Sequence, residues 1–500
     1  MKIAKLFSRA LIGMNAPQVI VEVHVAPGLP CFSIVGLPDT EVKESRDRVR
    51  SAIQNSGFDF PARRITVNLA PADLPKESGR YDLPIALAIL IASNLIQNCK
   101  HLNEFEFAGE LALDGELRPV KGALAIAFGA NDSSRQFILP TISANEAALI
   151  ENSQILQAST LKEVCDFLTG KSQLNTAQTI INSMSNQILN ADFSEVKGQL
   201  SAKKALEMAA AGRHSLLMIG TPGCGKSMLA TRLISILPFL TNQEAIESAS
   251  LHSLTHSGFN LANWQKAPYR APHHSISEAA LIGGGSNPKP GEISLAHNGI
   301  LFLDELAEFS RKALEALREP LETKKVHIAR VNQKVEYLAN FQLIAAMNPC
   351  PCGNLGHNQK ICTCSIEQIR RYQNKISGPL LDRIDLIIEV PTIKTHELQE
   401  LPNGETSAII AKRVANARQI QYQRQGKLNS DLNNQEIEKY CQLDLKTKQL
   451  LQQISDKEGF SARSYYRLLK LSRTIADLAN KDQIEMVHLA QAHQYKFKLS

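Results

Sequence analysis

The stretch 216–234, LLMIGTPGCGKSMLATRLI, places an apolar run, a glycine-rich turn and a helical pattern in direct succession. Gly220, Gly225, Lys226 and Ser227 have the G-x-x-x-x-G-K-S spacing of a phosphate-binding loop. Glycines let backbone N–H groups curl around a triphosphate, and the lysine ammonium reaches the β- and γ-phosphates. The predicted ATP-binding residues are Gly220, Thr221, Pro222, Gly223, Cys224, Gly225, Lys226 and Ser227, with the Ser227 hydroxyl on Mg²⁺.

Two further strand ends carry polar side chains suited to ATP hydrolysis. The apolar run 300–303 predicts a buried parallel strand that ends at Asp304 and Glu305. We expect Asp304 to hold the Mg²⁺ water shell and Glu305 to polarise the attacking water. The strand FQLIAAM ends at Asn348, whose amide would lie between the γ-phosphate and that water. An asparagine before proline is also a common turn former, and this alternative stays open.

The fold class expected from these patterns is α/β. Residues 1–170 alternate β-branched runs such as VIVEVHV with helical patterns such as TEVKESRDRVRSAIQNSG. Residues 171–191 are rich in Asn, Gln and Ser and predict a linker. Residues 192–400 carry strands and helices in βαβ order, and residues 401–500 predict helices only.

The composition indicates an ordinary globular protein, with 44% hydrophobic and 21% charged residues. The N-terminal stretch is broken by polar residues and predicts strands rather than a signal peptide, and no apolar run is long enough for a membrane span. We therefore expect a cytoplasmic protein. Residues 401–500 hold 16 Lys and Arg against 10 Asp and Glu, so the net charge of +6 comes entirely from this part, which is compatible with a polyanionic partner.

Four of the nine cysteines lie in the stretch 345–364, AAMNPCPCGNLGHNQKICTC. Two Cys-x-Cys pairs suit tetrahedral Zn²⁺, although the spacing within each pair is tighter than usual. The predicted ligands are Cys350, Cys352, Cys362 and Cys364, with His357 as a possible substitute; four reduced, unligated thiols are the alternative. The remaining thiols lie in apolar contexts and are expected to be buried without disulfides, namely Cys31, Cys99, Cys165 and Cys441. The Cys224 thiol is expected to point away from the nucleotide.

These motifs, together with YRAPHHSISEAALIGGGSNPKPGEISLAHNGILFLDEL and LLDRIDL, resemble the magnesium-chelatase-like AAA+ ATPases of the ComM/YifB family over nearly the whole chain. The resemblance implies a P-loop core with a helical lid, in a hexameric ring. It assigns Arg383 as an arginine finger that reaches the neighbouring subunit's γ-phosphate. It also assigns Arg463 as the sensor arginine of the lid, and the turn 198–199 (Gly198 and Gln199) to the adenine. Arg467 and Arg473 share the lid helix and are expected to be solvated.

The N-terminal residues resemble the Lon-protease-like α+β domain of the same family. In that domain a serine and a lysine form the catalytic dyad, but the matching positions here hold Tyr81 and Leu124. Ser78 and Lys121 lie nearby, outside the matching positions. We therefore expect a scaffold or a substrate-facing module without proteolytic activity.

The resemblance implies a motor that acts on DNA, as a helicase that promotes branch migration in natural transformation. Residues 326–341 predict a β-hairpin with Arg330 and Lys334 near its tip, where basic side chains could contact DNA phosphates. Residues 270–294 predict a mobile loop that interrupts the second core helix. In it, His273 and His274 could bind a metal, but loop hydrogen bonds are favoured.

Two other functions stay open at this point. A chelatase-type motor would remodel a porphyrin-binding protein partner and would not respond to DNA. An enhancer-binding transcription activator would also use the glycine-rich loop before LFLDE, but the last hundred residues show no helix-turn-helix pattern.

Overall fold

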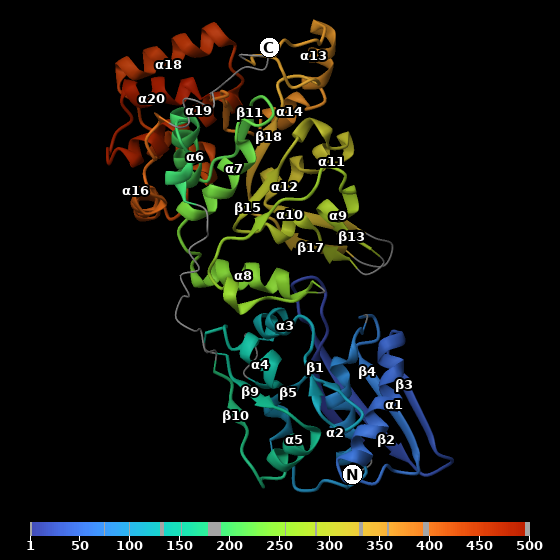
Figure 1. Cartoon of the computed structure of the whole chain (residues 1–500). Helices are drawn as coiled ribbons and strands as arrows, with labels where there is room; N and C mark the ends of the chain where they lie inside the picture. Colours follow the sequence, from blue (N-terminus) through green and yellow to red (C-terminus); the bar gives the residue numbers. More distant parts are fainter. Residues whose placement is uncertain are drawn as a thin grey trace.

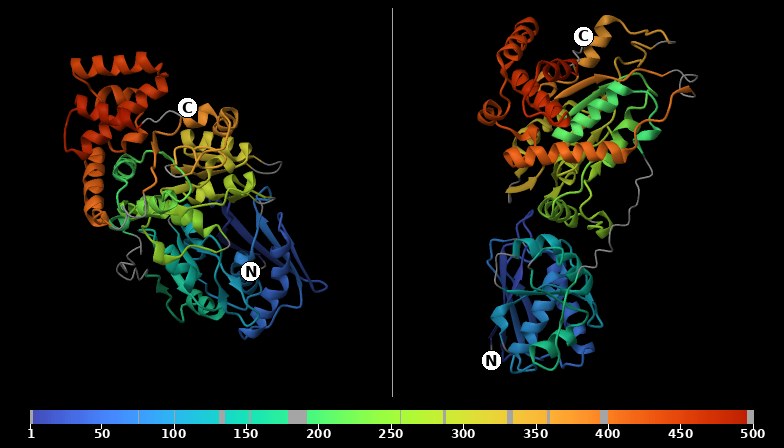
Figure 2. Two further views of the ribbon diagram at one scale, coloured as in Figure 1. Left: turned by 45° about the horizontal axis from the view of Figure 1, so that its top comes forward. Right: turned by 90° about the vertical axis from the view of Figure 1, so that its left-hand side faces the viewer.

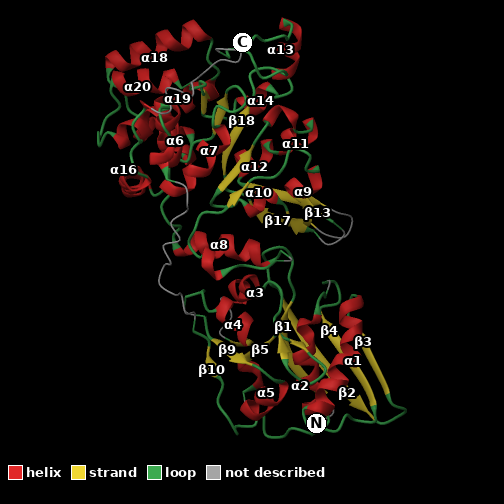
Figure 3. Ribbon diagram, viewed as in Figure 1, coloured by secondary structure: helices red, strands yellow, loops and turns green. Residues whose placement is uncertain are grey.

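The computed structural model places a mixed α/β lobe, a parallel sheet layered with helices and a C-terminal group of helices in chain order (Figures 1 and 3). The described residues are 3–74, 76–99, 101–130, 135–151, 153–178, 192–255, 257–285, 288–329, 334–357, 360–393 and 400–495. Most of the predicted linker, residues 179–191, therefore lies outside them. No helix within these ranges is both long and apolar enough to cross a bilayer.

The N-terminal lobe is built on a mixed eight-stranded sheet with the order β10-β9-β8-β5-β1-β2-β4-β3. Its strands are β1 (Ile3–Arg9), β2 (Gln18–Ala26), β3 (Cys31–Val35), β4 (Arg64–Ala70), β5 (Phe105–Phe107), β8 (Gln136–Pro140), β9 (Ile155–Ala158) and β10 (Asn175–Thr176). The accompanying elements are α1 (Thr40–Asn55), α2 (Asp82–Ala92), α3 (Ala123–Ala130), α4 (Thr141–Ala147), α5 (Leu161–Leu168) and the ribbon of β6 (Glu110–Leu111) and β7 (Leu117–Arg118).

The sequence patterns account for these elements. Every second residue of β2 from Val19 to Val25 is buried, as the alternation in VIVEVHV predicts. Helix α2 is apolar on all sides, and every one of its residues is buried. Cys165 and Cys441 are buried as predicted, and Cys99 is only half-buried. The prediction for Cys31 was wrong: it is exposed, because β3 is the edge strand of the sheet.

The central sheet has five strands in the order β12-β15-β18-β11-β19, and all its strand pairs are parallel. They are β11 (Leu216–Ile219), β12 (Tyr269–Arg270), β15 (Ile300–Leu303), β18 (Gln342–Met347) and β19 (Leu386–Glu389). The helices of this region are α6 (Leu200–Gly212), α7 (Lys226–Arg232), α8 (Asn242–Ser253), α11 (Arg311–Ala316), α12 (Arg318–Thr323), α13 (Ile366–Gln373) and α14 (Gly378–Leu381). Because the strands are parallel, the loops after β11, β15 and β18 meet at one edge.

Two appendages extend from this sheet. The predicted hairpin is present as β16 (Lys325–Ala329) and β17 (Lys334–Leu338), which pair antiparallel just before β18. The stretch 270–294 has more structure than the predicted loop. It contains α9 (Glu278–Ile282), the antiparallel ribbon of β13 (Gly283–Gly284) and β14 (Lys289–Pro290), and α10 (Glu292–Leu295). The two short strands approach closely at Gly283, where a Cβ atom would lie 2.4 Å from the Lys289 carbonyl oxygen.

The described part of the last hundred residues is helical, as predicted. Its helices are α16 (Ser407–Gln425), α17 (Asn434–Tyr440), α18 (Leu445–Glu458), α19 (Ala462–Leu478) and α20 (Met486–Gln494). Val414 and Leu469 share one apolar core with Leu206 of α6, so these helices pack on the parallel sheet region. Both views in Figure 2 show them at the end of the molecule away from the N-terminal lobe.

The N-terminal lobe contacts the central region through α8, which lies next to α3 in Figure 1. Ile246 and Ala249 of α8 enter the apolar cluster that contains Leu124 of α3. The Gly122 N–H also donates a hydrogen bond to the Ser253 carbonyl, with an N···O distance of 3.1 Å. The lobe is therefore docked on the side of the central region that carries α8.

Candidate nucleotide-binding site

The glycine-rich loop connects β11 to α7, as the sequence predicts. Gly223 and Gly225 have φ angles of 79° and 93°, which favour glycine. A Cβ atom on Gly220 would lie 2.6 Å from the Val390 carbonyl oxygen and 2.7 Å from the Cys224 sulfur. The loop geometry therefore requires glycine at these positions, and the buried Cys224 thiol packs beneath the loop.

Lys226 lies within the curve of this loop and is buried. Its ammonium donates hydrogen bonds to the carbonyl oxygens of Gly220 and Thr221 at 2.6 and 3.0 Å, and to Oδ1 of Asn348 at 3.3 Å. The structure thus joins the lysine of the first motif to the asparagine at the end of β18. Both are positioned to contact phosphate oxygens of a nucleotide bound in the loop.

The predicted Mg²⁺ ligands also lie together. The Ser227 hydroxyl donates a hydrogen bond to Oδ2 of Asp304 at 2.6 Å, and the Glu305 N–H donates to Oδ1 of Asp304 at 2.9 Å. A hydroxyl and a carboxylate beside a phosphate loop are the hard oxygen donors that Mg²⁺ prefers. The residues present therefore fit a Mg²⁺ ion held by Ser227 and Asp304, which would neutralise charge on the phosphates of bound ATP.

Glu305 has a left-handed backbone with φ of 52°. Its carboxylate contacts a residue that sequence reasoning did not place here: Nδ1 of His274 lies 3.1 Å from Oε2 of Glu305. The sequence did hold a signal for this contact. His274 closely follows β12, which neighbours β15 in the sheet, so both loops leave the same edge.

The turn 198–199 lies against the same loop. Both residues have left-handed backbones, with φ of 62° for Gly198 and 51° for Gln199. The Gln199 amide donates hydrogen bonds to the Pro391 carbonyl at 2.7 Å and to the Cys224 carbonyl at 3.4 Å. The structure therefore brings this turn beside the P-loop, where the resemblance places the adenine.

Arg383 lies at the opposite edge of the sheet. Its carbonyl accepts a hydrogen bond from Ser215, which directly precedes β11, whereas the P-loop follows β11. Nη2 of Arg383 is 2.8 Å from Oε1 of Glu322, and its side chain is only 11% exposed. Burial and the neighbouring Arg318 lower the pKa of Arg383. The structure thus keeps Arg383 away from its own subunit's P-loop.

Arg463 is not at the P-loop either. It forms an ion pair with the same Glu322 carboxylate that binds Arg383. Both arginines line a cleft of about 450 Å³ between the sheet's amino edge and the lid, together with Arg213, Lys324, Arg467 and Lys470. The sequence did not reveal Glu322, because its role depends on ion pairs with residues distant in sequence.

The expectation of solvated side chains at Arg467 and Arg473 was wrong. Arg473 is 1% exposed and forms an ion pair with Asp477, while Arg467 is 3.5 Å from Oδ1 of Asp385. The pKa of Asp385 falls to about 2, because hydrogen bonding to His214 and the nearby Arg467 outweigh its burial. Arg473 and Asp477 therefore pair within the lid, whereas Arg467 and Asp385 form a pair between the lid and the sheet.

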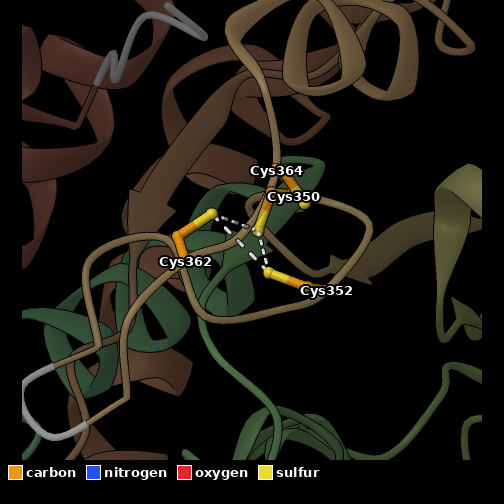
Figure 4. Close-up of side chains that lie close together, drawn as sticks. All are labelled: Cys350, Cys352, Cys362 and Cys364. Carbon is orange, nitrogen blue, oxygen red and sulfur yellow. Dashed lines mark hydrogen bonds between the residues drawn. The ribbon is translucent and has the colours of Figure 1, made fainter.

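The four predicted zinc ligands converge in the loop after β18 (Figure 4). The Sγ atoms of Cys350, Cys352 and Cys362 are 3.4 to 3.6 Å apart, and with Cys364 all four lie within 4.8 Å of one another. Tetrahedral Zn²⁺ with four thiolates needs sulfur–sulfur distances of about 3.8 Å. Backbone N–H groups lower the pKa of Cys352 to about 6. The four cysteines fit one metal ion, and His357 is not part of the group.

This cysteine loop touches the P-loop. A Cβ atom on Gly353 would lie 2.7 Å from the ring carbons of Pro222, so the two loops are in close contact. The amide of Gln373 on α13 donates a hydrogen bond to the Pro349 carbonyl at 3.2 Å. The loop therefore connects Asn348 and the P-loop to α13.

The positions of the N-terminal lobe that match the protease dyad hold a tyrosine and a leucine. Tyr81 and Leu124 are both completely buried, and burial raises the pKa of Tyr81. Ser78 accepts a hydrogen bond from Nε of Arg80 at 2.8 Å, and Lys121 is exposed. The two positions that match the dyad, Tyr81 and Leu124, thus belong to the apolar core.

The structure describes one of the two predicted DNA-contacting residues. Lys334 is exposed at the start of β17, opposite Ala329. Arg330 lies outside the described residues.

Comparison with known proteins places the whole chain in one group. Residues 192–398 match the family described as magnesium chelatase, subunit ChlI. Residues 21–143 match the subunit ChlI of Mg-chelatase, and residues 404–496 match the ChlI C-terminal family.

Full-length relatives agree with these matches. The chain is 50% identical to competence protein ComM of Haemophilus influenzae, over 99% of this chain and 98% of that protein. It is 50% identical to the uncharacterized protein YifB of Salmonella typhimurium, over 99% and 97% of the two chains. An uncharacterized protein of Mycobacterium tuberculosis is 37% identical over 99% of both chains. The chain therefore belongs to the magnesium-chelatase-like ComM/YifB family.

Proposed function

We propose that this protein is an ATP-hydrolysing motor that acts on DNA as a ring, and that it promotes branch migration when incoming DNA is integrated. The observation that carries the ATPase part is the convergence of Lys226, Ser227, Asp304 and Asn348 at one edge of the sheet. The DNA part rests on the family resemblance of the sequence and on the similarity to a protein named competence protein ComM.

The chain's own groups provide each step of hydrolysis. Lys226 and the loop N–H groups bind the β- and γ-phosphates, and Ser227 with Asp304 hold the Mg²⁺. Glu305 orients the attacking water and accepts its proton, because it is the carboxylate next to the metal ligand. The Asn348 amide forms a hydrogen bond with the γ-phosphate. It also holds the attacking water next to that phosphate.

The position of Arg383 supports the proposed ring. A guanidinium at the amino edge of the sheet cannot reach a phosphate at the carboxyl edge of the same sheet. In a closed head-to-tail ring, each subunit presents different surfaces to its two neighbours, so an arginine of one subunit can approach the site of the next. A hexamer with Arg383 and Arg463 reaching the neighbouring ATP satisfies this geometry.

The β16–β17 hairpin is the proposed DNA contact. Its buried face, with Ile328 and Val335, packs into the core of the sheet region and against Gly13 of the N-terminal lobe, whereas Lys334 at the start of β17 is exposed. Arg330 is close to Lys334 in sequence. Exposed basic side chains can follow a phosphate backbone without reading its sequence. The N-terminal lobe serves as a scaffold in this proposal.

DNA should stimulate ATP hydrolysis by the purified protein. We expect single-stranded and forked DNA to raise kcat several-fold at low salt, with less stimulation as the salt concentration rises, because phosphate contacts release counterions. A coupled ATPase assay over a series of salt concentrations measures this. Lys334→Glu and Arg330→Glu should reduce the stimulation without changing the basal rate.

Lys162→Glu provides the matched control, since Lys162 is an exposed lysine on α5 of the N-terminal lobe. A rate of ATP hydrolysis that no DNA substrate changes would contradict the DNA part of the proposal. It would favour the second candidate, a chelatase-type motor that remodels a protein partner, which the matched magnesium chelatase families support.

We further propose that the cysteine loop binds one structural Zn²⁺ through Cys350, Cys352, Cys362 and Cys364. The support is the close approach of all four sulfur atoms and the contact of Gly353 with Pro222. The metal would brace the loop that holds Asn348 against the P-loop. Four cysteine ligands leave no open coordination position, so a catalytic role is not proposed.

Protein purified without chelators should contain about one zinc ion per chain. The double substitution Cys350→Ser and Cys352→Ser should remove the metal and lower kcat about tenfold, with a smaller effect on ATP binding. Elemental analysis and nucleotide titration provide both measurements. Cys31→Ser with Cys99→Ser is the control, because neither thiol belongs to the cluster. Wild-type protein without zinc would contradict the assignment.

A further inference from the structure

A basic cavity opens between α11 and α13, and no P-loop residue lines it. Its volume is about 700 Å³, and it is lined by Arg311 of α11, by Arg370 and Arg371 of α13, and by Lys375 just after that helix. Figure 1 shows α13 at the end of the molecule away from the N-terminal lobe. This basic cavity is therefore distinct from the nucleotide-binding loop and from the contact between the two lobes.

The sequence of α13 separates a buried face from a basic one. Glu367, Arg370, Arg371 and Asn374 have the i, i+3, i+4, i+7 spacing of a single helix face, and all four are exposed. Tyr372 points to the other side and is buried. Because the buried face fixes the rotation of the helix, its two guanidiniums are held toward the basic cavity.

The positive charges of the basic cavity are only partly balanced. Within the described part of the chain, none of its three guanidiniums has a hydrogen-bond or ion-pair partner. Lys375 pairs with Glu308 at 3.2 Å, and Glu367 is the carboxylate among the lining residues. Three arginines thus share one acid, and an excess of positive charge faces the solvent. Guanidinium groups bind phosphate oxygens in pairs, so this excess matches a phosphate-rich ligand.

The basic cavity is connected to both strand ends of the nucleotide-binding site. On one side, the Gln373 amide of α13 donates a hydrogen bond at 3.2 Å to the carbonyl of the residue after Asn348. On the other side, Lys375 pairs with Glu308, which ends the short 3₁₀ turn that follows Glu305. A ligand in the basic cavity would therefore contact the two segments that continue from Asn348 and Glu305.

We propose that the basic cavity is a second DNA-binding site, which holds the phosphate backbone of a single strand through Arg311, Arg370 and Arg371. The inference rests on the proposed function, because it adds a contact for the same partner. A protein partner would need an apolar centre in its interface. The aromatic residue that lines the basic cavity, Phe309, is only 4% exposed and offers none.

Loss of the two α13 arginines should weaken DNA binding in a salt-dependent way. We expect Arg370→Gln with Arg371→Gln to lower the affinity for single-stranded DNA about tenfold at low salt. Each phosphate contact contributes about 0.7 to the slope of log K against log salt concentration, so the slope should fall by about 1.4. Fluorescence anisotropy of the full chain with labelled oligothymidine and a non-hydrolysable ATP analogue measures both quantities.

Two pairs of control substitutions test whether the positive charge at this place is responsible. Arg370→Lys with Arg371→Lys should retain most of the affinity and the salt slope, because an ammonium also pairs with phosphate. Arg118→Gln with Lys162→Gln removes two exposed positive charges from the N-terminal lobe and should change neither quantity. Thermal unfolding of each variant shows whether the fold is retained.

The outcomes distinguish this inference from the proposed function. Wild-type affinity and salt slope in the double glutamine variant overturn the second DNA site and leave the proposed function standing. Wild-type protein that binds no DNA contradicts both, and binding of polyglutamate through the same arginines would then assign the basic cavity to an acidic protein. Loss of ATP hydrolysis without DNA in the glutamine variant, at unchanged DNA affinity, would assign the arginines to a neighbouring subunit's ATP and also overturns the inference.

Discussion

Glu305→Gln should lower ATP turnover by at least about a hundredfold and leave ATP binding nearly intact. A general base contributes about 10² to 10⁴ in rate, and an amide cannot accept the proton of the attacking water. Binding persists because glutamine keeps the shape of the side chain and the P-loop contacts of Lys226 are untouched. Steady-state hydrolysis and titration with a fluorescent ATP analogue measure the two effects separately.

Lys226→Ala should also lose ATP turnover, but through loss of ATP binding rather than loss of the base. It removes the ammonium that lies inside the phosphate loop, so ATP affinity itself falls. Glu308→Gln is the matched control for Glu305, because Glu308 follows on the same segment but pairs with Lys375 at 3.2 Å. Near-normal hydrolysis by Glu305→Gln would contradict the assignment of the base.

The sequence predicted those parts of the site that depend on local pattern. A glycine-rich turn between an apolar strand and a helix specifies the P-loop by backbone conformation alone. Buried parallel strands are continuous apolar runs, so the runs before Asp304 and Asn348 also predicted where these side chains meet. The cysteine cluster was predictable for a similar reason, because its four ligands lie in one short loop.

Contacts between segments distant in sequence were not predictable in the same way. Glu322 on α12 pairs with both Arg383 and Arg463, which lie far from it in the sequence and line the same cleft. The pair of His274 and Glu305 needs the neighbouring positions of β12 and β15, which no single segment encodes. Cys31 shows the same limit: its apolar sequence context predicted burial, but the order of strands left β3 at the sheet edge.

Arg383→Ala should bind ATP normally and hydrolyse it about a thousandfold more slowly, since arginine fingers contribute on that scale. The structure adds a condition to this expectation. Arg383 is mostly buried and bonded to Glu322, so it must leave that carboxylate to reach a neighbouring phosphate. The same applies to Arg463, which shares Glu322. Subunit contact would therefore exchange an internal ion pair for one with ATP.

A mixing experiment tests whether the finger acts between subunits. Arg383→Ala protein has intact P-loops and Lys226→Ala protein has intact fingers, so neither should hydrolyse ATP alone. Random mixed rings place an intact P-loop against an intact finger at about a quarter of the interfaces. We expect hydrolysis to recover in the mixture at about that level, once labelled subunits are shown to exchange.

The control mixes Arg383→Ala with the double variant Lys226→Ala and Arg383→Ala. These rings contain intact P-loops but no arginine at position 383, so hydrolysis should remain at the level of Arg383→Ala alone. Recovery in the first mixture and not in the second assigns the rate to an arginine supplied by the neighbouring subunit. If subunits exchange and hydrolysis does not recover, Arg383 supports hydrolysis within its own subunit. Its side chain would then have to reach along the whole length of β11 to its own P-loop.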